Sequence, residues 1–88
     1  MIIIISENIG DNIRKIRKLR GLTQKELGEM LGATEAHVRA YEKGRRNPKD
    51  VTLKKIARAL DIDYTILKGY KAERISEIEL ESDMDYLL

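Results

Sequence analysis

Apolar residues recur every three or four positions through most of residues 9–68, which is the period of an amphipathic helix. Ile9, Ile13 and Ile16 show this spacing in the first such segment, and Gly21 ends it. The pattern restarts after each of several short breaks that are polar or contain glycine. The predicted helices cover residues 9–20, 23–31, 34–43, 50–60 and 63–67.

Several of these helices begin at a residue suited to capping. Thr23 and Glu26 form a capping box, in which a hydroxyl and a carboxylate each satisfy an amide at the helix start. Thr34 is placed to cap the next helix, and Asp50 and Asp63 are the expected N-caps of the last two. Short helices with short connections predict a compact all-α bundle.

The two ends of the chain are less regular. Met1–Ser6 is an apolar run without a helical period, and residues 78–81 alternate apolar and acidic, as strands do. One expectation is that these segments pair as short strands, within or between chains. Another is that residues 72–81 form a helix. A partly ordered acidic tail is the third alternative. The predicted units are an N-terminal apolar segment (1–6), a helical domain (7–69) and an acidic C-terminal tail (70–88).

Charge separates a basic body from an acidic tail. Up to Lys68 the chain has 15 Lys and Arg against 9 Asp and Glu, a net charge of +6. From Gly69 onward it has 2 against 6, a net charge of −4. This asymmetry favours an anionic partner for the body.

The composition argues against several classes of function. The chain has no Cys, a single His and no Gly-rich phosphate loop, so we expect no enzymatic activity, no metal site and no cofactor. The apolar run Ile2–Ile5 is too short to cross a membrane or to act as a signal sequence. A cytoplasmic protein is therefore expected.

The third predicted helix has two different faces. Val38 and Tyr41 lie on one side, which would face the bundle. Small and basic residues lie roughly on the other side, and a basic loop (residues 44–48) follows. Such a helix has the shape and charge to enter a DNA major groove. The residues on its outward side are Ala36, Arg39, Ala40 and Lys43.

A set of residues within 9–68 carries a resemblance to a known family. They are Gln24, Leu27, Gly32, Val38, Tyr41-Glu42-x-Gly44, Asn47-Pro48 and Leu53-x-x-Ile56-Ala57-x-x-Leu60. In their joint spacing they resemble the Cro/repressor-type helix-turn-helix family, also called XRE-type. The resemblance implies a phage-repressor-like bundle of five helices, whose second and third helices read DNA. Two departures are Gly28, where the family usually has Ala, and Asp61, where it often has Gly.

The resemblance also implies roles for individual residues. The base-reading positions are Glu35, Ala36, Arg39 and Ala40, and Arg39 is the best candidate because its fork can donate twice to guanine. Glu35 either accepts from a cytosine amino group or faces solvent and penalises wrong sequences. Arg17 and Glu42 match a structural ion pair. The residues expected at DNA phosphates are Gln24, Thr34, His37, Lys43, Arg45, Arg46 and Asn47.

The expected function is that of a sequence-specific DNA-binding transcriptional regulator, a repressor acting as a homodimer on a palindromic operator. One helix-turn-helix unit reads few base pairs, and a two-fold dimer on half-sites about 34 Å apart doubles the readout. The alternative is an antitoxin or adaptor whose main role is to bind a partner protein, with the acidic tail as the partner segment.

Overall fold

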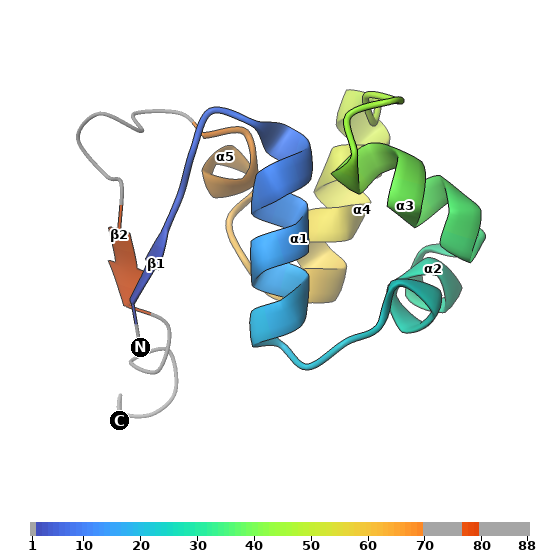
Figure 1. The fold of residues 1–88 in the computed structure, drawn as a ribbon, viewed down its shortest axis with the longest axis horizontal. Helices are drawn as coiled ribbons and strands as arrows, with labels where there is room; N and C mark the ends of the chain where they lie inside the picture. The colour runs from blue at the N-terminus through green and yellow to red at the C-terminus, as the bar shows by residue number, and fades with distance from the viewer. Residues whose placement is uncertain (1, 70–76, 80–88) are drawn as a thin grey trace.

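The computed structural model describes residues 2–69 and 77–79. Within these residues the chain forms the helices α1 (Ile9–Leu19), α2 (Gln24–Leu31), α3 (Glu35–Glu42), α4 (Asp50–Leu60) and α5 (Tyr64–Leu67). Figure 1 shows α1 and α4 in the middle, with α2 and α3 on one side and α5 on the other. The predicted all-α bundle of five helices is confirmed. No helix in this described part is long and apolar enough to span a bilayer.

The core is aliphatic, and each helix contributes to it. Met30 departs from the apolar pattern: it lies three positions after the buried Leu27, a spacing that would place both on one helix face, but it is 54% exposed. The reason is that α2 ends one residue later and leaves an open groove of about 420 Å³ against α4, which Met30 lines. The buried apolar residues are Ile5, Ile13, Ile16, Leu27, Val38, Leu53, Ile56, Ala57, Leu60 and Leu67.

The ends of α2 and α3 follow the predicted capping chemistry. The Thr23 hydroxyl accepts a hydrogen bond from the Glu26 amide at 3.0 Å, and the Glu26 carboxylate accepts from the Thr23 amide at 2.8 Å. The Thr34 hydroxyl accepts from the amide of His37 at 3.1 Å. These bonds satisfy amides that a helix start leaves without a partner, so both starts are set locally by the sequence.

The start of α4 corrects one prediction. Asp50 was expected as its N-cap, but Lys49 occupies that position without a side-chain capping bond, and Asp50 is the first helical residue. The Asp50 carboxylate instead accepts hydrogen bonds from the Tyr64 hydroxyl and the Lys68 ammonium group. The Asp50 side chain therefore links the start of α4 to Tyr64 and Lys68 instead of capping its own helix.

The end of α4 depends on two polar residues. Asp61 takes the left-handed conformation with φ of 56° at the position where the family often has Gly. The Arg20 guanidinium donates to the carbonyl oxygens of Leu60 and Asp61 at 2.8 and 2.9 Å. A cation is favourable here because the last carbonyls of a helix carry partial negative charge.

The strand alternative for the chain ends is confirmed in the described residues. Strand β1 (Ile2–Ile4) pairs antiparallel with strand β2 (Glu77–Glu79) of the same chain, with Ile3 opposite Ile78. A helix over residues 72–81 is therefore wrong for residues 77–79, because β1 supplies a partner for their alternating pattern. The rest of the acidic tail lies outside the described residues.

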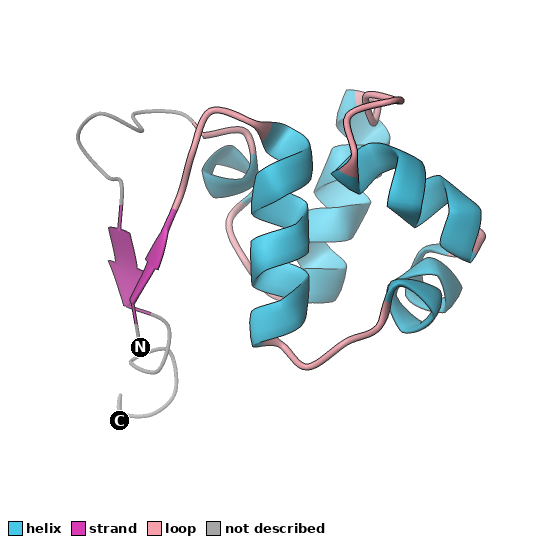
Figure 2. Ribbon diagram, viewed as in Figure 1, coloured by secondary structure: helices cyan, strands magenta, loops and turns pink. Residues whose placement is uncertain are grey.

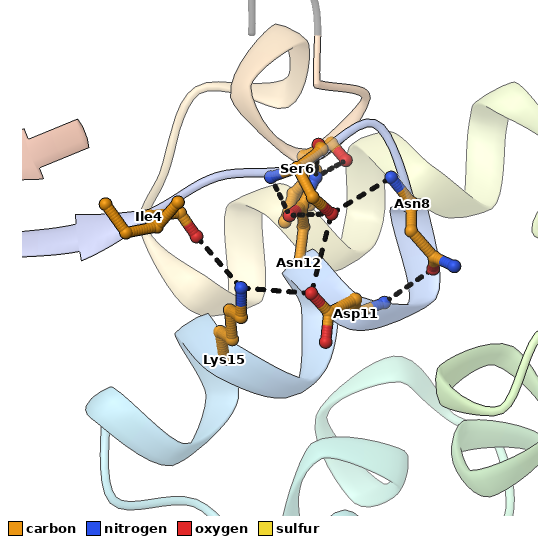
Figure 3. Close-up of polar contacts among 7 residues, drawn as sticks. Ile4, Ser6, Asn8, Asp11, Asn12 and Lys15 are labelled. Atoms are coloured by element: carbon orange, nitrogen blue, oxygen red, sulfur yellow. Dashed lines mark hydrogen bonds and ion pairs between the residues drawn. The ribbon is translucent and has the colours of Figure 1, made fainter. Parts of the chain in front are cut away.

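A buried asparagine fastens the segment after β1 to the helices (Figure 3). Asn12 is fully buried: its oxygen accepts from the Ser6 amide at 2.9 Å, and its nitrogen donates to the carbonyls of Ser6 and Leu67 at 2.7 and 3.0 Å. Lys15 adds a bond from its ammonium group to the carbonyl of Ile4 at 3.1 Å. Together these bonds join the N-terminal segment to α1 and α5.

Replacing Asn12 with Ala should lower the free energy of unfolding by about 3 kcal/mol, because it leaves buried backbone groups without partners. The matched control is Asn8→Ala, which removes an exposed N-cap bond to Asp11 and should cost only about 1 kcal/mol. Urea unfolding followed by circular dichroism measures both. Equal losses in the two variants would contradict the role given to Asn12.

Candidate nucleic-acid interface

Helices α2 and α3 cross closely at the turn that joins them. Gly32 ends α2 in the left-handed conformation with φ of 68°, and Thr34 then starts α3. A Cβ built on Gly28 would lie 3.1 Å from both the carbonyl carbon and the oxygen of Thr34. Helix α2 therefore meets the backbone at the start of α3 at Gly28, the position where the family usually has Ala.

Helix α3 has one buried face and one exposed face. Val38 is fully buried and Tyr41 is half-buried against the core, whereas Glu35, Ala36 and Arg39 are exposed. Ala40 is half-buried and lies closer to the bundle than the other outward residues. The exposed side of α3 therefore holds a short row of candidate base-reading residues.

The end of α3 also rests on α1, through a glycine that sequence reasoning missed. A Cβ on Gly10 would lie only 2.3 Å from the Tyr41 carbonyl oxygen and 2.7 Å from that of Glu42. The backbones of α1 and α3 can approach this closely only because Gly10 has no side chain. A glycine inside an otherwise helical pattern was the available signal.

Glu42, the last residue of α3, is bound by two other elements. Arg17 on α1 donates from Nε at 2.5 Å and from Nη2 at 3.1 Å to the two carboxylate oxygens of Glu42. Gln24 at the start of α2 donates from Nε2 to the same carboxylate at 3.0 Å. The side chains of Arg17 and Glu42 are only 8% and 2% exposed. Helices α1, α2 and α3 thus meet at one buried carboxylate that accepts three hydrogen bonds.

Several residues expected at phosphates have partners within the chain. Gln24 is bound to Glu42, and the hydroxyl of Thr34 is bound to the amide of His37. His37 is half-buried and lines a cavity of about 300 Å³ between α3 and α4. Lys43 is exposed at the C-terminal cap of α3.

The basic loop between α3 and α4 is drawn in pink in Figure 2. Backbone hydrogen bonds attach it to α3. The carbonyl oxygen of Ala40 accepts from the amides of Arg45 and Arg46 at 2.9 and 3.3 Å. Gly44, with φ of 77°, provides the reversal that makes these bonds possible. Arg45, Arg46 and Asn47 are all exposed. They are consecutive in the chain and lie beside the end of α3.

Outward from α3, Arg39 and Glu35 contact each other. The Arg39 Nη2 atom lies 3.3 Å from the Glu35 Oε2 atom, and the two side chains are 45% and 48% exposed. They are four positions apart on one helix, a spacing at which opposite charges attract.

Asp50, the first residue of α4, belongs to a polar cluster. The Tyr64 hydroxyl donates to the Asp50 carboxylate at 2.5 Å, and this bond lowers the pKa of Asp50 below its ordinary value. The same bond raises the pKa of Tyr64. Lys54 and Lys68 lie over the Tyr64 ring, 5.3 and 5.1 Å from its centre. The cluster joins the start of α4 to α5.

The helix-turn-helix family model (HTH_3) matches residues 13–67. An uncharacterized HTH-type transcriptional regulator of Sinorhizobium fredii is 36% identical over 59 residues, which cover 67% of this chain and 77% of that protein. The HTH-type transcriptional repressor RghR of Bacillus subtilis is 40% identical over 73 residues. That match covers 82% of this chain but only 53% of RghR, so the chain spans about half of that relative.

A similar fold occurs in the P22 c2 repressor, whose structure was solved with a synthetic operator. Its TM-score is 0.66 at 26% identity, with 70% of this chain and 94% of that chain covered. Within the described residues, no group of three or more His, Cys, Asp and Glu side chains is placed to hold a metal ion.

Breaking the Arg17–Glu42 pair from one side should cost more stability than removing both charges. Glu42→Leu alone leaves a buried guanidinium without its partner and should lower the free energy of unfolding by about 3 kcal/mol. In Arg17→Met/Glu42→Leu no unpaired charge remains, so the loss should be smaller than the sum of the two single losses. A double-mutant cycle in urea measures the coupling, and additive losses would argue against the pair.

The Asp50–Tyr64 bond should make stability depend on pH at both extremes. Asp50 has a lowered pKa in the fold, so its contribution is present above the ordinary value of 3.8 and is lost as the pH falls through the folded pKa. Tyr64 has a raised pKa, so its contribution is present below 10.0 and is lost as the pH rises through the folded pKa.

Tyr64→Phe should therefore lower the urea midpoint at pH 7 and flatten its decline toward acid. Tyr41→Phe, which removes a phenol from α3 instead of α5, is the control. If Tyr64→Phe shows the same acid decline as the wild type, the bond does not contribute.

Proposed function

The chain belongs to the helix-turn-helix family of transcriptional regulators, and from this premise we propose that it binds double-stranded DNA sequence-specifically through the exposed face of α3. The observation that carries the proposal is the division of α3 into two faces. Val38 and Glu42 hold the helix to the bundle, while Glu35, Ala36 and Arg39 face outward. An exposed helix with small and charged residues fits the width of a major groove.

Arg39 is the proposed principal base reader, because an arginine fork can donate to both O6 and N7 of guanine. Ala36 and Ala40 offer only methyl groups, which suit close approach or contact with a thymine methyl. Glu35 lies next to Arg39 on the same face. With so few long side chains on this face, a single unit would discriminate only a few base pairs.

The proposed phosphate contacts lie at both ends of α3 and at the start of α2. Arg45, Arg46 and Asn47 form an exposed basic group, and Lys43 lies next to them. Gln24 donates one amide hydrogen to Glu42, and an amide nitrogen has a second hydrogen that a phosphate can accept. Thr34 and His37 at the start of α3 complete the proposed set. Such contacts set the position of the protein on DNA and carry no sequence information.

We further propose that the protein acts as a repressor and binds as a homodimer to a palindrome. RghR is named a repressor, and the P22 c2 repressor was solved with an operator. Two copies related by a two-fold axis would place two α3 helices in successive major grooves, about 34 Å apart. This arrangement compensates for the limited readout of one unit.

Selection from a random duplex pool should recover a palindrome with half-sites about 10 base pairs apart. Affinity for it should fall with salt by about 0.9 log units per log unit of salt for each phosphate contacted. Arg46→Gln should reduce this slope by about 0.9 for every contact that it removes. Fluorescence anisotropy at increasing KCl concentrations gives the slope.

The matched control is Arg58→Gln, which removes the same charge from the exposed side of α4 without touching the proposed interface. Its salt slope should equal that of the wild type. Selective binding with a flat salt response would contradict the proposed phosphate contacts, and recovery of no preferred sequence would contradict the proposed function.

A further inference from the structure

We propose that Glu35 is a positioning residue for Arg39: it holds the guanidinium in a base-reading orientation and weakens its attraction to phosphate. The inference rests on the proposed function and gives one of its residues a different role, since Glu35 itself would contact no base. It starts from the ion pair between Glu35 Oε2 and Arg39 Nη2 on the exposed face of α3.

Among its neighbours on the outward face of α3, Glu35 is the one that restrains the Arg39 side chain. Its other neighbours on the outward face are Ala36, Ala40 and Lys43. The two methyl groups cannot direct a long side chain, and Lys43 carries the same charge as Arg39, so Glu35 is the one of these neighbours that attracts the guanidinium. A free arginine loses about 2 kcal/mol of side-chain entropy when it is fixed in one geometry. A carboxylate that already restrains the side chain reduces the part of this cost that falls on DNA binding.

The pair leaves enough donors for a base. A guanidinium has five N–H donors, and one bond from Nη2 to Glu35 leaves the others available for a fork toward guanine O6 and N7. Glu35 is also in the first turn of α3, a position that suits an acidic side chain because the helix start carries partial positive charge.

The same carboxylate selects against the wrong contact. Phosphates attract any arginine regardless of sequence, and that attraction dominates nonspecific binding. An acidic group next to Arg39 repels phosphates and neutralises part of the arginine charge. Glu35 should therefore lower affinity for unrelated DNA while keeping the base preference of Arg39, which increases the specificity ratio.

The test compares Glu35→Ala with the charge-matched Glu29→Ala, whose side chain lies exposed on α2. The first DNA probe is the duplex that the wild type selects. The second set changes one base pair of that duplex, the one at which Arg39→Ala no longer shows a preference. The third probe is an unrelated duplex. A bidentate arginine contact is worth about 5- to 150-fold in discrimination. Dissociation constants for all probes are measured at one salt concentration.

Glu35→Ala should reduce the preference at the Arg39 base pair at least about fivefold and bind the unrelated duplex about two- to fivefold more tightly. Glu29→Ala should keep every preference. Glu35→Gln, which retains an acceptor oxygen without the charge, should recover part of the lost preference. The double variant Glu35→Ala/Arg39→Ala should show the same preference as Arg39→Ala alone, because Glu35 acts through Arg39.

Two results would overturn the inference while leaving the proposed function intact. Base preferences of Glu35→Ala that match those of Glu29→Ala would show that the pair has no role in recognition. Loss of preference at a different base pair, additive with the effect of Arg39→Ala, would show that Glu35 reads a base itself. If the wild type selects no sequence, the proposed function fails and the role of Glu35 falls with it.

Discussion

The buried carboxylate of Glu42 is the interaction on which the arrangement of the first three helices depends. It ends α3 and accepts hydrogen bonds from Arg17 on α1 and Gln24 on α2. Removing a carboxylate from water costs several kcal/mol, so the group is tolerable only while these partners are in place. Apolar packing alone would allow small shifts between helices. A polar contact with strict geometry therefore fixes the angle at which α3 leaves the bundle.

Local chemistry made much of this fold predictable from the sequence. The capping box at Thr23 and Glu26 and the cap at Thr34 depend only on neighbours within one turn, and the structure contains them. Asp50 was assigned wrongly because its partners on α5 are distant in sequence. Gly10 was missed for a similar reason, since its role depends on Tyr41 and Glu42 at the end of α3, which lie more than 30 residues later in the chain. Sequence spacing identified the exposed face of α3, but it could not show which side chains there contact each other.

The N-terminal segment is part of the folded unit even though it precedes the helical pattern. The predicted boundary at residue 7 falls next to Ser6, whose backbone is held by Asn12, and to Ile5, which is buried in the core. Gly69 packs against the same point: a Cβ there would lie 2.3 Å from the carbonyl oxygen of Ser6. Segments from both ends of the helical region thus meet beside α1. Their contact is made through backbone groups, which a hydrophobic pattern does not reveal.

The separation of the two faces of α3 has an evolutionary consequence. The helix is held by Val38, by Glu42 and by the backbone bonds at its ends, and none of these lies on the exposed side. Glu35 and Arg39 contact each other without contributing to the core. Mutations on this side are therefore nearly free of folding cost. Such a surface can diversify between lineages while the scaffold stays unchanged, so close relatives can keep one architecture and diverge in what they recognise.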